Sequence, residues 1–314
     1  MSNWSASAAA PSGWSELCAK SDSLFHSEEW LTLLGRSFPC SSLYLLDEDR
    51  GHGAAITQFR AGPFRIGYLG FPVGGVVGAD ALTNEFVEEL RREKGMPVAV
   101  RIPVSGFDES VELELPYETT PETAIIDLQS WSLSRVTKNR RRDVNRSLRS
   151  GLDVVDASDP ADGARIYDLY RKTLERKDGS LRYNATYFSG LIALTQTHSR
   201  IRVLLAMKDE SIAAFTVVAL HGSVAYYLHG AYDWSLREYL PSALLLNEAI
   251  EWAKSVGCET FSLMSSPKGQ ESLVSYTERW GAETREHRTY TLPMSWAYGG
   301  FRMAEWLYRQ AHRS

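Results

Sequence analysis

The sequence predicts an α/β protein built from two tandem domains, each a mixed β-sheet flanked by helices, with a cleft between them. The first reason is a repeated order of elements in residues 42–104 and 201–266: two strands, a third strand ending in glycine, a loop, a helix, a glycine and a strand. The second reason is that landmark residues recur at nearly constant offsets. Ala54 aligns with Ala213, Gly70 with Gly230 and Gly95 with Gly257, at offsets of 159, 160 and 162 residues. Such regular spacing indicates an internal repeat.

Local patterns predict the elements of each repeat. The runs "FRIGYLG" and "VAYYLHG" are rich in β-branched and aromatic residues and end at glycine, as strands do. After Ser242, apolar residues recur at steps of three and four, which predicts an amphipathic helix. Ser242 is the predicted N-cap, and Gly257 ends the helix.

These patterns divide the chain into four segments and a leading stretch. The predicted parts are an N-terminal domain over 22–134, a basic linker helix over 135–152, a C-terminal domain over 153–295 and an amphipathic C-terminal helix over 296–314. Residues 1–20 are expected to be disordered. The C-terminal helix is expected to pack on the protein, with a membrane-surface or partner role as the alternative.

Composition narrows the class of protein. With 314 residues, 44% hydrophobic and 23% charged, the chain is typical of a globular protein with a large core. Its three cysteines are isolated and its histidines are scattered, so neither a disulfide framework nor a metal site is expected. The N-terminal sequence lacks the basic and apolar regions of a signal peptide, and we expect a cytoplasmic location.

Charge is distributed unevenly along the chain. The net charge is −5, which disfavours general DNA binding. Residues 135–149 nevertheless hold seven cations and one acid, a balance of +6. This stretch is a candidate phosphate-binding surface, for RNA or for a nucleotide-linked substrate, or else the solvated face of a linker helix.

Several segments together resemble the FemAB-like transferases, which consist of two tandem GNAT-fold domains. The matching segments are "FHSEEWLTLLGRSFP", "YLGFPVGGVVG", "KNRRRDVNRSLRSGL", "YRKTLERKDGSLRY", "GAYDWSLREYLPSALLLNEAIEWAKSVGCETFSL" and "SYTERWGA". The resemblance covers residues 22–292. It implies transfer of an acyl or aminoacyl group to an amine, with acyl-CoA or aminoacyl-tRNA as co-substrate and no tightly bound cofactor. The acceptor it implies is a small-molecule amine or a lipid- or nucleotide-linked one.

Two features depart from the cell-wall members of this family. Their closing segment has an aromatic–lysine pair, where this chain has Tyr276-Thr277. A lysine can stabilise an oxyanion, whereas threonine offers only a neutral hydrogen bond. The heptad repeats of a coiled-coil arm are also missing. These departures weaken the expectation of cell-wall peptidyl transfer.

The loop 237–242 stands where a GNAT acyltransferase has its glycine-rich diphosphate cradle. Arg237 keeps the first position, but Leu240 and Ser242 replace the two small residues and Pro241 has no N–H. This composition argues against a CoA cradle. The glycine-rich stretch 71–80 in the first domain is closer to a cradle in composition, but the resemblance implies that it shapes the acceptor cleft.

The candidate site residues are assigned by role. The candidate general bases are His229 and Asp233, which follow the central strand of the second domain. The candidate substrate-binding residues are Arg176, Lys177, Tyr183, Tyr232, Ser266 and Lys268, and the candidate donor-binding residues are Arg237, Ser242, Arg141 and Arg142. The alternative hypothesis is a non-catalytic scaffold that keeps the fold and binds a ligand or partner.

Overall fold

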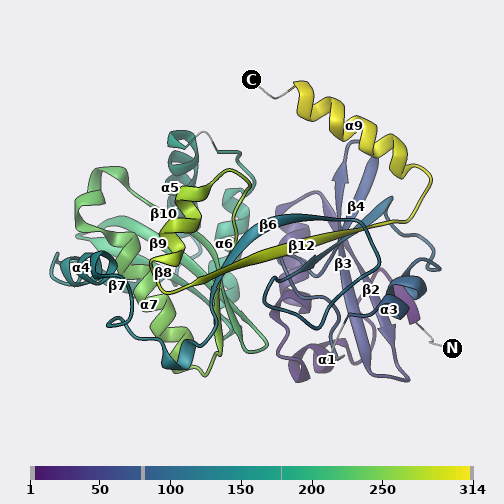
Figure 1. The fold of residues 1–314 in the computed structure, drawn as a ribbon, viewed down its shortest axis with the longest axis horizontal. Helices are drawn as coiled ribbons and strands as arrows, with labels where there is room; N and C mark the ends of the chain where they lie inside the picture. Colours follow the sequence, from purple (N-terminus) through teal and green to yellow (C-terminus); the bar gives the residue numbers. More distant parts are fainter. Residues whose placement is uncertain (1–3, 79–81, 178, 312–314) are drawn as a thin grey trace. The chain divides into compact units, whose positions relative to one another are not determined.

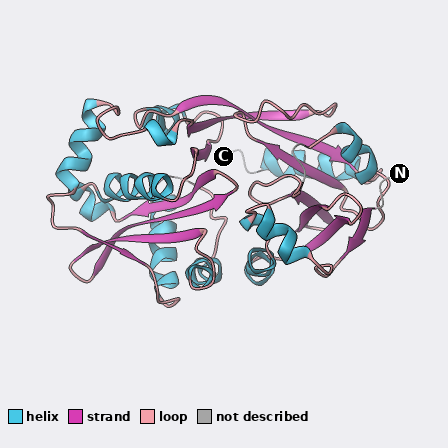
Figure 2. Ribbon diagram, turned by 90° about the horizontal axis from the view of Figure 1, so that it is seen from below, coloured by secondary structure: helices cyan, strands magenta, loops and turns pink. Residues whose placement is uncertain are grey.

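In a computed structural model, the chain forms two compact α/β units (Figure 1). Unit 1 comprises residues 1–119 and 286–314, and unit 2 comprises residues 120–285. The structure describes residues 4–78, 82–177 and 179–311. Figure 2 shows both units as strands (magenta) with helices (cyan) packed beside them. The linker segment predicted to separate two domains is part of unit 2, and the C-terminal helix is part of unit 1.

Unit 1 is built on the strand order β1-β2-β3-β4-β5-β12. Its elements are β1 (Trp4–Ser7), α1 (Trp14–Lys20), η1 (Leu24–His26), α2 (Glu28–Ser37), β2 (Cys40–Asp47), β3 (His52–Ala61), β4 (Phe64–Leu69), α3 (Asn84–Leu90), β5 (Ala99–Val104), the pairing part of β12 (Glu283–Pro293) and α9 (Tyr298–Ala311).

Unit 2 is built on the strand order β6-β11-β10-β9-β8-β7. Its elements are β6 (Tyr117–Ile125), η2 (Leu128–Ser130), α4 (Lys138–Ser147), β7 (Asp153–Asp156), α5 (Asp162–Arg176), α6 (Ala185–Thr195), β8 (Ile201–Lys208), β9 (Ser211–His221), β10 (Val224–Tyr232), η3 (Trp234–Tyr239), α7 (Pro241–Ser255), β11 (Thr260–Ser265) and α8 (Glu271–Glu278).

The internal repeat is confirmed by strand pairing. In unit 1, β2, β3 and β4 pair antiparallel in order, and β4 then pairs parallel with β5 across α3. In unit 2, β8, β9 and β10 do the same, and β10 pairs parallel with β11 across α7. A parallel pair requires a crossover connection, which α3 and α7 supply. The predicted α/β fold of two similar domains is therefore correct.

The core of unit 2 forms where α7 packs on the sheet. Apolar residues of the helix, including Leu245, Ala249 and Ile250, are fully buried. They share one cluster with strand residues such as Ala225 and Phe261, and with Val144 of α4. The apolar residues at steps of three and four, which predicted the helix, thus form its buried face. This packing fixes the start of α7 against the ends of the strands.

Two local predictions are wrong. Residues 1–20 are not a disordered leader in the described range, because β1 pairs antiparallel with β2 and Trp14 is fully buried, its indole donating to the His26 carbonyl at 2.8 Å. Ser242 is not the N-cap of α7. The helix begins at Pro241, the position proline favours, and Leu240 is the N-cap in the left-handed region, with φ of 56°.

Candidate active site

The central strands of unit 2 separate at their ends. β10 pairs with β11 only from Val224 to Tyr226, opposite Thr260 to Ser262. Beyond that point β10 continues to Tyr232 paired with β9 alone, while β11 pairs with β6. Past Tyr226, one edge of β10 has no ladder partner among the described residues, and backbone N–H groups on that edge can donate hydrogen bonds to a bound group.

A bulge in β10 decides which face His229 occupies. The register with β9 shifts between Tyr227 and His229, so the usual alternation of side chains is interrupted. Tyr227 packs with the cluster beneath α7, whereas His229 contacts the aromatic residues of α6. The next position is a glycine, Gly230, because a Cβ there would lie only 1.7 Å from the Tyr227 hydroxyl oxygen.

His229 is a buried, neutral histidine. Its Nε2 lies 3.0 Å from the Tyr187 hydroxyl, and its ring packs edge-on against Tyr183 at 4.4 Å. Burial lowers the pKa of His229 to about 3. Burial likewise raises the pKa of Tyr183 to about 12, so that phenol is also neutral. The imidazole is therefore uncharged at neutral pH, with one ring nitrogen unprotonated, but it is a weak proton acceptor.

Asp233 is positioned as a cap. Its Oδ1 accepts hydrogen bonds from the backbone N and the Oγ of Ser235, at 2.8 and 2.7 Å, at the start of η3. This contact orders the loop that leads from β10 to α7. The half-buried carboxylate thus has a structural task beside any part in proton transfer.

Three of the predicted residues meet around Trp234. The Arg176 guanidinium lies 4.6 Å from the centre of the Trp234 ring and 5.0 Å from that of Tyr232. Arg237 lies 4.8 Å from the Trp234 ring and donates to the Trp234 carbonyl at 2.8 Å. We call Arg176, Tyr232, Trp234 and Arg237 the stacked cluster. It is an accessible surface, since Trp234 is 49% exposed, and cations on aromatic faces of this kind suit flat or anionic ligands.

The loop before α7 cannot act as a backbone cradle. Pro241 has no N–H, and the N–H of Ala243 donates to the Leu240 carbonyl at 3.0 Å. A diphosphate nest needs several N–H groups converging on one point. Ser242 lies half-buried in the first turn of α7.

Beside this loop lies an open, basic hollow of about 380 Å³. We call it the basic hollow. Its lining residues are Arg146, Arg149, Ser150, Glu238 and Tyr239. Two guanidinium groups thus face one carboxylate. A third cation adjoins it, because Lys208 Nζ lies 5.2 Å from the Tyr239 ring and 3.4 Å from the Ser150 carbonyl oxygen. Arginine side chains of this kind can form charge-assisted hydrogen bonds with an anion.

The predicted donor residues of α4 lie outside the lining of this hollow. Arg141 is exposed and donates to the Ser134 carbonyl at 3.1 Å, and Arg142 is exposed as well. Arg140 instead pairs with Asp143 at 3.3 Å and lies 4.8 Å from the Tyr276 ring. The helix therefore presents cations to solvent on one side and anchors itself to α8 on the other.

The remaining predicted residues are separate from these groups. Ser266 is buried and its N–H donates to the Pro121 carbonyl at 2.7 Å, whereas Lys268 is exposed in the following turn. Lys177 is exposed at the C-terminal end of α5. Thr277 is 5% exposed and its hydroxyl is within 2.7 Å of the Val274 carbonyl in its own helix. Its hydroxyl proton is thus directed to the backbone, away from any oxyanion.

The glycine-rich loop of unit 1 is held by a histidine. His26 Nε2 lies 3.1 Å from the Gly75 carbonyl oxygen, and a Cβ on Gly74 would lie 2.4 Å from His26 Cε1. Trp30 Nε1 donates to the Phe71 carbonyl at 2.7 Å. These contacts hold the loop in place, and residues 79 and 80 of the predicted stretch lie outside the described residues.

Sequence reasoning missed Trp234 and Tyr187, and it did not predict that Arg146 and Arg149 line one hollow. Trp234 had a signal, since it lies directly after the predicted residues Tyr232 and Asp233. Tyr187 had none, because its place beside His229 depends on how α6 packs on β10. Across the described ranges, no three or more His, Cys, Asp or Glu side chains are placed to hold a metal ion. Nor does any helix there combine the length and apolar character needed to cross a bilayer.

Comparisons with known proteins agree with this architecture. The family model described as "Acetyltransferase (GNAT) domain" matches residues 134–271. The crystal structure of FemX is 13% identical, with a TM-score of 0.65, covering 90% of this chain and 96% of its own. L-PGS from Bacillus licheniformis is 16% identical, with a TM-score of 0.59 and coverages of 89% and 91%.

A third similar structure is the C-terminal domain of a putative lysylphosphatidylglycerol synthetase from Agrobacterium fabrum. It is 13% identical, with a TM-score of 0.54, and covers 86% of this chain and 89% of its own. A search of curated protein sequences gave no match. The family match supports acyltransferase activity. Residues 134–271 thus match the GNAT acetyltransferase domain, and the chain has a fold of two GNAT-like units similar to that of FemX.

Proposed function

We propose that the protein transfers an aminoacyl group from aminoacyl-tRNA to the amine of a lipid- or nucleotide-linked, or small-molecule, acceptor. The single observation that carries the choice of donor is the basic hollow beside a loop that has lost its backbone cradle. Arg146 and Arg149 would bind phosphates of the tRNA acceptor strand. The exposed cations Lys138, Arg141 and Arg142 continue along α4 and suit a polyanion that extends beyond one diphosphate.

The names of the similar structures support the same class of reaction. FemX and the lysylphosphatidylglycerol synthetase domain share the fold, and the second name denotes attachment of lysine to a lipid. The stacked cluster offers faces on which an unpaired base can lie, because Trp234 and Tyr232 are aromatic and the two arginines are planar cations. It lies directly after the unpaired end of β10, where we place the reaction.

In the proposed reaction, the acceptor nitrogen attacks the ester carbonyl of the aminoacyl group. A C–N bond forms, the C–O bond to the ribose breaks, and the ribose oxygen leaves with the proton lost by the amine. Backbone N–H groups on the unpaired edge of β10 would stabilise the oxyanion. His229 or Asp233 remains the proposed acceptor of the amine proton, and for His229 the low pKa requires that it pass the proton on quickly.

The test is calorimetric titration of the purified protein with aminoacylated total tRNA at two salt concentrations, and separately with acetyl-CoA. We expect stoichiometric binding of tRNA that weakens with salt, and no heat with acetyl-CoA. Micromolar binding of acetyl-CoA alone would contradict the proposed donor and make the protein an acyl-CoA-dependent transferase. Binding to neither would favour a scaffold that keeps the fold.

A further inference from the structure

The C-terminal segment of unit 1 presents a row of large apolar side chains to solvent. Trp296, just before α9, is 96% exposed. Met303, Trp306 and Leu307 on the helix are 62%, 56% and 55% exposed. Positions separated by three or four residues share one helical face, so Met303, Trp306 and Leu307 lie together, and Trp296 lies in the turn before the helix. We call these four exposed side chains the α9 stripe.

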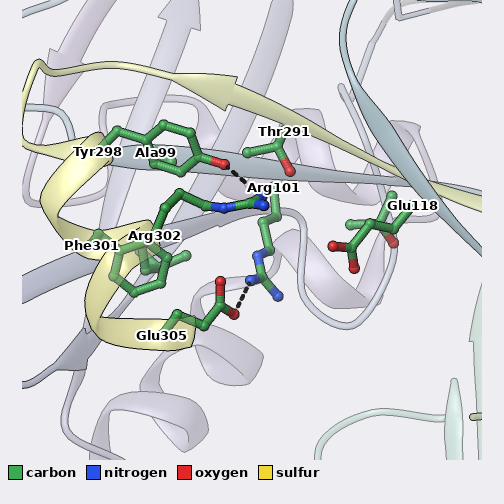
Figure 3. Close-up of a pocket in the computed structure, with 10 residues that line it drawn as sticks. Ala99, Arg101, Glu118, Thr291, Tyr298, Phe301, Arg302 and Glu305 are labelled. Carbon is green, nitrogen blue, oxygen red and sulfur yellow. Dashed lines mark hydrogen bonds and ion pairs between the residues drawn. The ribbon is translucent and has the colours of Figure 1, made fainter. Parts of the chain in front are cut away.

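The opposite face of α9 is fastened to the sheet of unit 1. Phe301 is buried against Phe64, with ring centres 5.8 Å apart, and Arg101 pairs with Glu305 at 3.1 Å (Figure 3). Arg101 also donates to the Tyr68 hydroxyl at 3.2 Å. The helix, drawn in yellow beside β4 in Figure 1, is thus a built part of unit 1. Because the inner face is fixed, the stripe is held outward.

The segment that carries the stripe is basic in sequence, and Arg302 lies beside the stripe. Residues 294–314 contain three arginines and one acid, a balance of +2 in a chain whose net charge is −5. The acid is Glu305, which the Arg101 guanidinium already neutralises. Arg302 is exposed at the boundary between the two faces, near Glu305 and Glu118. Tryptophan and leucine on one face with arginine beside them are typical of helices that lie in a membrane interface.

We propose that α9 docks on an anionic membrane surface, with the α9 stripe inserted at the boundary of headgroups and acyl chains and Arg302 against lipid phosphates. A second copy of the chain is a poorer fit. The exposed parts of four large side chains offer on the order of 500 Å², below the roughly 800 Å² that each partner buries in a standard interface. This inference goes beyond the proposed reaction and does not depend on it.

The test is co-sedimentation of the full-length protein with phosphatidylcholine vesicles in which about a third of the lipid is anionic phosphatidylglycerol. We expect binding to these vesicles and weaker binding to pure phosphatidylcholine. Trp306→Glu/Leu307→Glu should lower the partition coefficient about tenfold or more. Val256→Glu, which changes a 50% exposed apolar residue in unit 2, is the matched control and should bind like wild type.

Folding and self-association are checked on the same samples. The double variant should keep the wild-type thermal transition, since both side chains face solvent; if it does not, Met303→Glu replaces it. Equal vesicle binding by wild type and variant would overturn the proposal. So would a wild-type dimer in size-exclusion chromatography that the variant converts to monomer while neither form binds vesicles.

Discussion

Ser147 Oγ donates a 3.2 Å hydrogen bond to the carbonyl oxygen of Leu240. It joins the end of the basic helix α4 to the residue that precedes α7, and Ser147 is fully buried. Arg146 and Arg149 flank this contact and line the basic hollow. The hollow is therefore formed by α4 together with the loop 237–242, which lie about ninety residues apart in the chain.

Ser147→Ala should weaken donor binding without direct removal of a charge. The Leu240 carbonyl still accepts from the Ala243 N–H, so loss of this one hydrogen bond should cost about 0.5–1.5 kcal/mol of stability. We expect the donor Kd to rise several-fold because the arginines are less well placed. Ser255→Ala is the control, since its hydroxyl bonds only within α7. Unchanged donor affinity in Ser147→Ala would separate the hydrogen bond from the function of the hollow.

The stability of the protein should fall on acidification. Burial lowers the pKa of His229 to about 3 and that of His26 to about 4, below the ordinary value of about 6.5. At pH values between the folded-state pKa and the unfolded-state pKa, the unfolded chain binds more protons than the folded one. The free energy of unfolding therefore decreases as pH falls below about 6.5. From pH 7 to pH 5 we expect a loss of about 2 kcal/mol for each histidine.

Urea unfolding at the two pH values measures this loss. His229→Gln, which removes one of the two imidazoles with a lowered pKa, should show about half the pH dependence of wild type. An identical pH dependence in the variant would mean that His229 is protonated in the folded protein near its ordinary pKa.

Gly74→Ala should destabilise unit 1. A Cβ there would lie 2.4 Å from His26 Cε1, and the backbone has a φ of 149°. We expect a loss of about 2–4 kcal/mol from the clash and the strain together. Gly75→Ala is the matched control because its φ is also positive but no atom lies within 4 Å of the added Cβ. It should lose only about 1–2 kcal/mol, and equal losses would refute the role of His26 as a clamp.

Trp234→Ala should impair substrate use more than folding. Removal of the indole takes the stacking partner from both Arg176 and Arg237. Because Trp234 is half exposed, we expect a change in stability of roughly 0.5–1 kcal/mol but a five- to fifty-fold rise in KM for the donor, on the order of the 1–3 kcal/mol that stacking of one base supplies. Trp234→Phe should restore most of the affinity. A normal KM for Trp234→Ala would exclude the stacked cluster from donor binding.

Much of the fold could be predicted because duplication leaves the same pattern twice. Ala54 and Ala213 lie in equivalent strands β3 and β9, and glycines 95 and 257 follow equivalent helices. The start of α7 was misplaced by two residues because a left-handed leucine is rare at an N-cap. The order in residues 4–20 was missed because it depends on burial of Trp14 against distant residues.

The site was less accessible from sequence for a physical reason. The face occupied by His229 depends on a bulge, which shifts the alternation of β10 and leaves no mark in the residue pattern. The basic stretch was recognised by its charge, but charge alone could not separate Arg146 and Arg149, which line the hollow, from Arg141 and Arg142, which do not. That distinction depends on how α4 packs against the start of α7.

The most direct test of the proposed donor site is the affinity of Arg146→Gln/Arg149→Gln for aminoacylated tRNA, measured across a range of salt concentrations. We expect the Kd to rise at least about tenfold and the slope of log K against log salt to fall by about 1–2, because two phosphate contacts are lost. Arg165→Gln, an exposed arginine paired with Asp162, is the control and should match wild type. Wild-type affinity and slope in the double variant would contradict the assignment of the basic hollow to donor phosphates.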